Sequence, residues 1–433
     1  MTPLRKLRFR RPARTTAFLL LLLAATARGA PAPDVVLRAE QSAGRKLDIR
    51  VEPIGATGGA AAGEGASLVG RIIVADLRNS GYFRVSGPLA GAGADSFPPA
   101  FVITGELEGD PPARAGAAAP ALTLRLQTAP GRELVLGKRY APSRDQLRAT
   151  AHHFVDQVVQ LLTGEPGIGL SRIVFSRGKA DRRDLWVVDY DGENLTRLTA
   201  NRTLNLCPSW SPDGGQIAFT SYSAGQQGIY LLDTATGRVR QVIATAGLNL
   251  GPVWRPGGGE LLLSLSKDGN PEIYRIDLAG RIVRRLTVSP AIEISPDWSP
   301  NGRDIVFTSD RTGTPQLYVM DADGAGRNRL TFEGDYNDSG TWSPNGEQIL
   351  YVTRSGNRTF LVLVAASGEN RRLLTDESWR HAEDPSWAPD GRHVVFASDR
   401  SGANKLYVMD VFNGAWRQLT VGNEPDITPA WSR

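Results

Sequence analysis

From residue 172 onward, short apolar runs alternate with polar turns in a pattern that repeats along the chain. One unit contains "DIVFTSD", then "QLYVMD" and then "RNRLT", and the other units contain close variants of these three runs. The runs are five to seven residues long, rich in Val, Ile, Leu, Phe and Tyr, and bounded by Gly, Pro, Asp or Asn. Such runs are typical of β-strands, so the pattern predicts three strands in each unit.

Tryptophan marks the period of the repeat. Trp210, Trp254, Trp298, Trp342, Trp387 and Trp431 are spaced 44, 44, 44, 45 and 44 residues apart. Five of them open a turn such as "WSPDG", in which proline presets φ and glycine accepts a positive φ. The "P-x-W" segment before each turn is predicted to be a fourth strand, with Gly340 in place of proline in one copy.

A unit of four strands cannot bury both of its faces alone, but six such units stacked radially can. The sequence therefore predicts an all-β, six-bladed β-propeller over residues 169–433. A linear solenoid would need polar capping repeats, and neither end of the repeat region resembles a cap. The first blade lacks its own first strand, which "ITPAWS" at the C-terminus is expected to supply, closing the ring.

Residues 39–165 do not share this period, and they predict a small α/β domain before the propeller. "KLDIRVEP" reads as a strand, and the segment that ends at Gly81 has apolar residues at helical spacing. Three further strands follow. Ser143 and Gln146 form a capping box for a second helix that runs to about Leu162.

The second helix predicts one buried face. The apolar stripe consists of Leu147, Phe154, Val155, Val158, Leu161 and Leu162. On the same helix, His152 and His153 are expected to be solvated rather than to act as ligands. The Gly/Ala-rich segments 57–63 and 113–119 are predicted to be flexible loops.

The first 27 residues have the features of a secretory signal peptide. A basic head is followed by the apolar "AFLLLLLAATA" and by small residues that permit cleavage after Ala27 or Ala30. Because residues 1–27 contain six positive charges and no acidic residue, the formal net charge falls from +5 to −1 on cleavage. The mature protein is thus expected to be exported, with no nucleic-acid partner and no membrane insertion.

The sequence also lacks the chemistry of common enzymes. The nearest string to a G-x-S-x-G nucleophile elbow, "GASLVG", has Val69 where glycine is required. With four histidines, the sequence offers few candidates for a histidine-based triad or a metal site. No phosphate-binding glycine loop is present. We expect no catalytic residues, metal or cofactor. The lone cysteine, Cys207, cannot form an internal disulfide.

Several segments together resemble the TolB family of the Tol–Pal cell-envelope system. These are "IIVADLRNSGYFRVSG", "AHHFVDQVVQLLTGEPG" leading into "SRIVFSR", and the repeated "P-x-W-S-P-D-G" units after a signal peptide. The resemblance implies a non-enzymatic, monomeric periplasmic scaffold. It implies binding of the peptidoglycan-associated lipoprotein Pal at the propeller mouth and of TolA through the N-terminal segment, in support of outer-membrane invagination during division and envelope integrity.

The predicted partner site lies in the loops that lead into the innermost strands. Five residues before the tryptophans stand the ring-equivalent residues Asn205, Asn249, Glu293, Asn337, Ala382 and Asp426, which are expected to line one mouth of the channel. The resemblance places lipoprotein contacts at Leu248, Asn249, Leu250, Gly251, Ile292, Glu293, Ile294 and Ser295. The apolar members of this set would be anchors within a polar rim.

A second predicted site is a mobile arm at residues 31–38, just after the cleavage site. Its residues Asp34, Val35, Val36, Leu37 and Arg38 would engage TolA. A weaker hypothesis is a Ca²⁺ site, because carboxylates near the mouth suit that ion: Glu293, Asp335, Asp338, Glu383, Asp384 and Asp426. No EF-hand spacing supports it, so an acidic rim without a cation is the preferred interpretation. Two other functions remain open: a periplasmic propeller hydrolase acting on peptide or glycan, and a module that binds a small molecule.

Overall fold

The computed structural model describes residues 46–91, 97–111 and 121–432. The predicted signal peptide, the predicted arm at residues 31–38 and the predicted loop at 113–119 lie outside the described residues. Within the described part of the chain, no helix has the length and apolar character needed to cross a membrane.

The first part of the described chain is an α/β unit built on one sheet. Its helices are α1 (Ala60–Asn79) and α2 (Leu147–Thr163), with short 3₁₀ turns at Pro88–Ala90 and Arg144–Gln146. Its strands are β1 (Leu47–Val51), β2 (Gly55–Thr57), β3 (Phe83–Ser86), β4 (Phe101–Glu108), β5 (Leu122–Thr128) and β6 (Leu134–Tyr140). The strand order is β3-β1-β4-β5-β6, with β2 paired to β4. Strand β1 is parallel to both of its neighbours, whereas β4, β5 and β6 are antiparallel.

The two helices pack by their apolar faces, as their periodicity predicts. Ile72, Ile73 and Leu77 of α1 share one buried core with Phe154 and Val158 of α2. The capping box of Ser143 and Gln146 is present.

Three details of this region were predicted wrongly. Residues 60–63 belong to α1 and not to a loop. Leu161, placed in the buried stripe, is half exposed, because it lies on the flank of α2. His152 is buried rather than solvated, for a reason given below.

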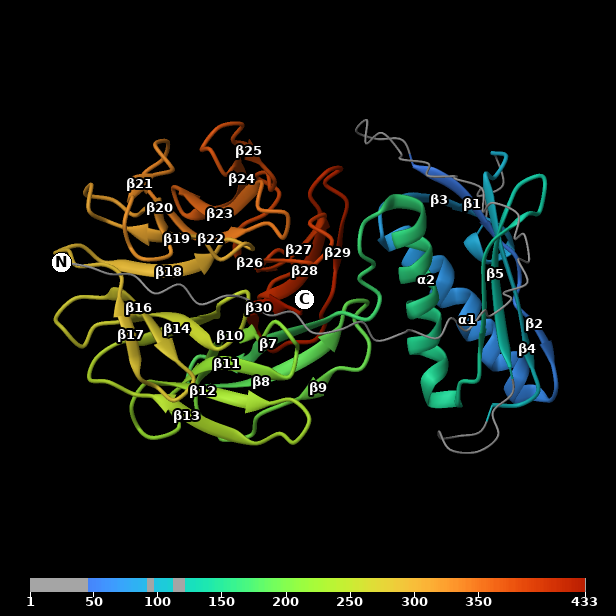
Figure 1. Cartoon of the computed structure of the whole chain (residues 1–433), viewed down its shortest axis with the longest axis horizontal. Helices are drawn as coiled ribbons and strands as arrows, with labels where there is room; N and C mark the ends of the chain where they lie inside the picture. The colour runs from blue at the N-terminus through green and yellow to red at the C-terminus, as the bar shows by residue number, and fades with distance from the viewer. Residues whose placement is uncertain (1–45, 92–96, 112–120, 433) are drawn as a thin grey trace, which may run out of the picture. The chain divides into compact units, whose positions relative to one another are not determined.

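The second part of the described chain is a propeller of six four-stranded antiparallel sheets, which we number as blades I to VI (Figure 1). Blade I consists of β30 (Asp426–Trp431), β7 (Arg172–Lys179), β8 (Arg182–Asp189) and β9 (Thr196–Arg197). Blade II consists of β10 (Asn205–Trp210), β11 (Gln216–Ser221), β12 (Gly228–Asp233) and β13 (Val239–Ile243). Blade III consists of β14 (Asn249–Trp254), β15 (Glu260–Leu265), β16 (Glu272–Asp277) and β17 (Ile282–Arg285).

The remaining blades follow the same order. Blade IV consists of β18 (Glu293–Trp298), β19 (Asp304–Ser309), β20 (Gln316–Asp321) and β21 (Asn328–Arg329). Blade V consists of β22 (Asn337–Trp342), β23 (Gln348–Ser355), β24 (Arg358–Ala365) and β25 (Arg372–Leu373). Blade VI consists of β26 (Ala382–Trp387), β27 (His393–Ser398), β28 (Lys405–Asp410) and β29 (Trp416–Gln418). In Figure 1 the first strand of each blade lies toward the centre and the last toward the periphery.

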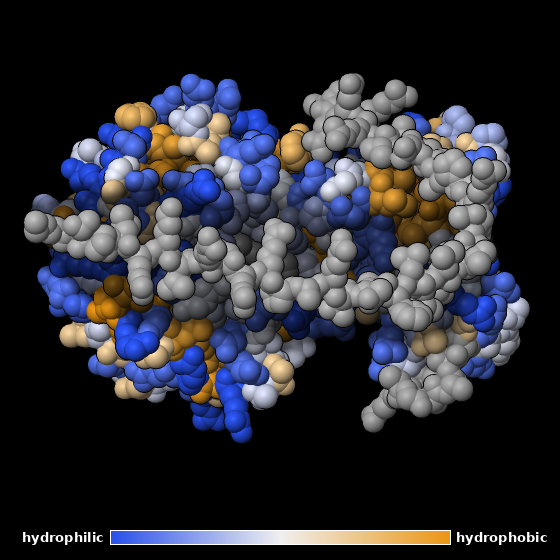
Figure 2. Space-filling model, viewed as in Figure 1, coloured by the Kyte–Doolittle hydropathy of each residue, from blue (hydrophilic) through white to orange (hydrophobic). Residues whose placement is uncertain are grey.

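The core of the propeller lies between blades, as expected for units that cannot bury their own faces. Each of six hydrophobic clusters joins residues of two neighbouring blades. For example, Leu185 of blade I packs with Trp210 and Phe219 of blade II. Most of the visible propeller surface is hydrophilic, with scattered apolar side chains (Figure 2).

The C-terminal strand closes the ring, which confirms the predicted architecture. Strand β30 pairs with β7, so Trp431 lies opposite Ile173. The indole Nε1 of Trp431 donates to Ser171 Oγ at 2.7 Å. The domain limits 39–165 and 169–433 stay predictions. Helix α2 ends before residue 165 and strand β7 begins after residue 169.

The aspartates that end the third strands stabilise turns. Asp233 accepts from the backbone N–H of Thr236 at 2.8 Å, and Asp277 accepts from that of Arg281 at 2.9 Å. Asp189 instead accepts from the side chain of Asn194 at 2.7 Å. These contacts give the recurring residue a structural role in the turn.

Candidate functional site

The candidate site is one end of the propeller, which we call the mouth. At this end the innermost strands begin and the hairpins between the second and third strands of each blade turn, for example before Asn337 and at residues 356–357. The ring-equivalent residues predicted to line the mouth are Asn205, Asn249, Glu293, Asn337, Ala382 and Asp426. All six have an exposed fraction of 0%. The expectation that their side chains line the channel is therefore wrong.

These buried residues hold the loops that lead into the innermost strands. Asn249 accepts from the N–H of Thr245 at 2.9 Å and donates to the Thr245 carbonyl at 2.8 Å, four residues earlier. Asn337 likewise donates to the carbonyl of Glu333, at 2.8 Å. The loops before Asn249 and Asn337 are thus closed by the residue that starts the next strand, because buried backbone groups require partners.

Glu293 also bonds the loop that precedes it, and its carboxylate is in addition charged and paired with a cation. Its carboxylate accepts two hydrogen bonds from the Arg311 guanidinium, both at 2.9 Å. It also accepts from Ser289 Oγ at 2.7 Å, again four residues earlier, and from Ser309 Oγ at 3.0 Å. A buried carboxylate with this many donors is a structural group, so a charge reversal at Glu293 would disrupt the blade rather than a binding surface.

Two residues later in each innermost strand, the backbone enters the left-handed region. The residues are Cys207, Gly251, Ser295, Ser339, Asp384 and Thr428, with φ between 49° and 64°. In every blade the pairing register of the innermost strand shifts at this point, which marks a β-bulge. Because only Gly251 is a glycine, no local sequence signal identifies the other five.

The bulges connect blades around the channel. The Cys207 N–H donates to Thr428 Oγ1 at 3.3 Å, and the Thr428 N–H donates to Asp384 Oδ2 at 3.1 Å. Burial, followed by the charge of Asp384, raises the pKa of the Cys207 thiol to about 12, so the thiol stays protonated and unreactive.

A cavity of about 530 Å³ opens at the mouth between blades V and VI. It is lined by polar residues that include Tyr336, Asp338, Arg354, His381, Glu383 and Asp384. Burial and the neighbouring charge of Glu383 raise the pKa of Asp384 to about 6. Burial and Asp338 raise the pKa of Tyr336 to about 12.

Nothing in the described ranges has the arrangement of a metal centre. Among residues 46–91, 97–111 and 121–432, no three His, Cys, Asp or Glu side chains converge to hold an ion. Of the carboxylates considered for Ca²⁺, Glu293 and Asp426 are already neutralised by buried ion pairs with Arg311, Arg177 and Lys405.

Exposed apolar side chains lie at the mouth on blades III and IV. Val288 and Ile292 belong to the loop between β17 and β18, and their exposed fractions are 68% and 44%. Phe332 is at the position equivalent to Val288 in the next loop and is 73% exposed. Of the predicted contact residues, Leu248, Leu250, Gly251, Ile294 and Ser295 are half-buried. Of this predicted set, Ile292 is the apolar side chain that is exposed.

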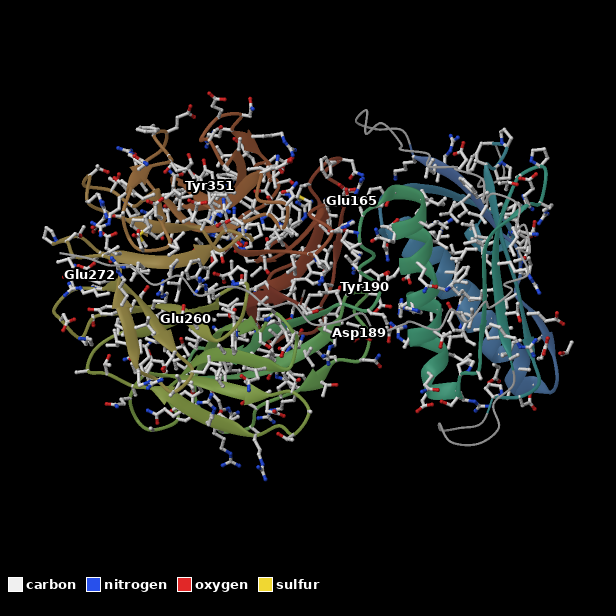
Figure 3. All side chains as sticks on the ribbon, in the orientation of Figure 1. Glu165, Asp189, Tyr190, Glu260, Glu272 and Tyr351 are labelled. Atoms are coloured by element: carbon white, nitrogen blue, oxygen red, sulfur yellow. The ribbon has the colours of Figure 1, made fainter. Side chains whose placement is uncertain are left out.

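A buried polar network at the α1–α2 contact was missed by sequence reasoning. His152 of α2 contacts Asp76 of α1, and Asp76 also accepts a hydrogen bond from the hydroxyl of Tyr190. Tyr190, which is labelled in Figure 3, follows β8. Burial and the charge of Asp76 raise the pKa of Tyr190 well above its usual value. The only sequence signal was a carboxylate in the middle of an apolar helix face.

Known proteins resemble this chain in sequence and in fold. A family model described as the TolB beta propeller domain matches residues 159–433. The Tol-Pal system protein TolB of Geobacter sulfurreducens is 34% identical over 215 residues, which are 47% of this chain and 48% of that protein. The protein of the same name from Geobacter metallireducens is 36% identical over 184 residues, 40% of this chain and 42% of that one. The chain thus spans about half the length, or less, of these curated relatives.

A solved structure matches over nearly the whole fold. The crystal structure of TolB from Acinetobacter baumannii superposes with a TM-score of 0.76 at 27% identity, over 90% of this chain and 98% of that one. The match therefore includes the α/β unit as well as the propeller. Since the family model covers well over half of the residues, the chain belongs to the TolB β-propeller family.

Proposed function

We propose that the protein is a non-enzymatic periplasmic scaffold of the Tol–Pal system. In this proposal it binds the lipoprotein Pal at the propeller mouth and TolA through its N-terminal segment, and so supports outer-membrane invagination and envelope integrity. Family membership and the match to the A. baumannii protein support the assignment to this system. The N-terminal segment lies outside the described residues, so its role rests on the resemblance in sequence alone.

The observation that carries lipoprotein binding is the exposed apolar arc of Val288, Ile292 and Phe332 on two adjacent blades. Large apolar side chains exposed together on a polar surface mark interaction sites. They also have the character of interface anchors, which bury apolar area within a polar rim.

The lack of enzymatic activity is also part of the proposal. His393 is buried, and its Nδ1 lies 2.6 Å from Asp390 Oδ2. His152 pairs with Asp76 in the same way. In the described ranges, neither of these histidines hydrogen-bonds a serine or cysteine, which a nucleophilic triad requires.

The lipoprotein interaction can be tested by calorimetry with purified Pal from the same organism. We expect the double variant Ile292→Asp/Phe332→Asp to bind at least about tenfold more weakly, because both anchors would have to bury a charge. Val239→Asp, at an exposed apolar position on the peripheral strand β13, is the matched control and should bind normally. Unchanged affinity of a correctly folded double variant would show that the arc is not the docking surface.

The TolA interaction needs a separate test. Deletion of residues 31–38 should abolish TolA binding while leaving Pal binding and the melting temperature nearly unchanged. If the deletion instead melts the α/β unit, these residues form part of its core and the arm proposal is wrong.

A further inference from the structure

Blade I departs from the repeat at its mouth-side hairpin. In blades II, III, IV and VI the second and third strands each have six residues, but β7 and β8 of blade I have eight. The two additional pairs are Gly178 with Arg183 and Lys179 with Arg182. Blade V has a hairpin of the same length, in which Ser355 and Arg358 occupy the equivalent last pair. The two hairpins therefore provide an internal comparison.

One aromatic position also differs in blade I. The residue of the third strand that pairs with the central aromatic or aliphatic residue of the second strand is a buried tyrosine in four blades: Tyr230, Tyr274, Tyr318 and Tyr407. In blade I it is Trp186, whose side chain is only half-buried. The indole lines a cavity of about 470 Å³. Part of the indole packs against the core between blades VI and I, and the Arg177 guanidinium lies 5.4 Å from a ring centroid, so only the remaining exposed part of Trp186 is available to a ligand.

Several of the cations in and around this cavity already form ion pairs with carboxylates. Asp426 accepts from Arg177 Nε at 2.6 Å and Nη2 at 2.9 Å, and from Lys405 Nζ at 3.1 Å. Two cations thus share one buried carboxylate. Arg197, on the wall, is paired with Asp184 at 2.5 Å.

The rim carries cations without such partners. Lys179 and Arg182 are exposed, and none of the ion pairs found in the described part of the chain includes either of them. The lining as a whole is Arg177, Gly178, Lys179, Asp181, Arg182, Asp184, Trp186, Arg197 and Glu424. Together with Asp426 and Lys405, which pair with Arg177 beneath this lining, there are five cations and four carboxylates, so the cavity keeps one positive charge in excess and favours an anionic ligand.

We infer that this cavity binds an acidic segment of a protein partner. The carboxylates of the segment pair with Lys179 and Arg182 at the rim, and an adjacent apolar or aromatic side chain packs on Trp186. A volume of about 470 Å³ is in the range of sites that enclose several groups, and far exceeds what a single carboxylate or phosphate fills. The inference rests on the proposed function, because Glu424 and the blade I hairpin lie at the mouth where the partner is proposed to dock.

A pair of synthetic peptides tests the inference directly, without the lipoprotein. The probes are acetyl-Gly-Phe-Asp-Glu-Gly-amide and its uncharged counterpart acetyl-Gly-Phe-Asn-Gln-Gly-amide, titrated into the protein spanning residues 31–433. We expect the acidic peptide to bind at least about tenfold more tightly, because only carboxylates form charge-assisted hydrogen bonds with Lys and Arg. Its affinity should fall as salt rises from 50 to 300 mM, roughly as expected for exposed charges.

Variants locate the binding to blade I. Lys179→Glu/Arg182→Glu should weaken the acidic peptide at least about tenfold. The control is Arg358→Glu at the equivalent position of the blade V hairpin, which should change the affinity less than about twofold. Trp186→Tyr restores the residue of four other blades, so it should fold normally and still reduce affinity several-fold by removing part of the stacking surface.

Three outcomes would overturn the inference. These are equal binding of the two peptides, full affinity in the Lys179→Glu/Arg182→Glu variant, and binding of the carboxylated sugar N-acetylmuramic acid at Trp186 when the acidic peptide does not bind. The proposed function would still hold in each case if Pal bound normally and if this binding depended on Ile292 and Phe332. Loss of that dependence with intact peptide binding would count against the proposed docking arc alone.

Discussion

The Nδ1 atom of His152 lies 2.6 Å from Asp76 Oδ2, where α2 crosses α1, and the two residues are only 3% and 4% exposed. Burial by itself lowers the pKa of His152, but the hydrogen bond to Asp76 and its charge outweigh burial, so the pKa is raised. The paired imidazolium is therefore favoured in the folded protein.

This pair predicts a pH dependence of stability. Because the folded-state pKa is raised above the unfolded value, the stabilisation is complete below the unfolded pKa and is lost as pH rises through the folded pKa. His152→Gln should lower the free energy of unfolding by about 2–3 kcal/mol at pH 6, as expected for a buried charged hydrogen bond. Urea unfolding from pH 6 to pH 9 should show the difference narrowing. A constant difference would show that folding does not raise the pKa of His152.

Asp384 at the mouth predicts a second loss of stability with rising pH, in a lower pH range. Burial and the charge of Glu383 raise its pKa to about 6, so between about pH 4 and 6 the unfolded chain releases this proton before the folded protein does. Stability should fall as pH rises through that window. Asp384→Asn avoids the cost of the buried charge, and we expect it to be more stable than the unmodified protein by about 1–2 kcal/mol at pH 7 and equal at pH 4. Asp335→Asn, an exposed neighbour on the preceding loop, is the control and should have no effect at either pH.

Glu293 predicts a structural rather than a binding phenotype. Glu293→Ala leaves the Arg311 guanidinium and two serine hydroxyls without their acceptor, and should cost about 3 kcal/mol. Chemical unfolding measures this, with the exposed Glu333→Ala as control. A variant that is fully stable yet binds the lipoprotein poorly would restore Glu293 to the contact surface.

The closing strand predicts that the ring is one cooperative unit. Deletion of residues 426–433 removes β30 together with Trp431, and exposes the inner edge of β7 and the cluster between blades VI and I. We expect the whole propeller to lose its cooperative thermal transition, because each blade is buried only by its neighbours. A chain shortened by Arg433 alone should melt normally. Five intact blades in the deleted chain, seen as protected amides in hydrogen exchange, would contradict this view.

The repeat was readable from the sequence because its signals are local. A proline, a tryptophan and an Asp-Gly or Asn-Gly turn recur every 44 or 45 residues, and turn chemistry depends only on adjacent residues. The spacing predicted six blades, and the unpaired "ITPAWS" predicted that the C-terminus completes blade I, as the pairing of β30 with β7 confirms. The capping box of α2 was predictable for the same reason.

The tertiary structure alone decided which polar residues of the repeat face solvent. Asn249 and Glu293 are polar residues at the start of an innermost strand, where the sequence pattern predicts side chains on the rim of the mouth. Both are fully buried, because each forms a hydrogen bond with the loop residue four positions earlier. Likewise, nothing in the local sequence of Ser295 or Asp384 requires a positive φ. That conformation occurs where the pairing register of each innermost strand shifts at a β-bulge, a feature of the strand pairing and not of the local sequence. The sequence by itself therefore determined the number and order of the blades, whereas the exposed arc of Val288, Ile292 and Phe332 and the cavity at Trp186 depend on which faces the neighbouring blades cover.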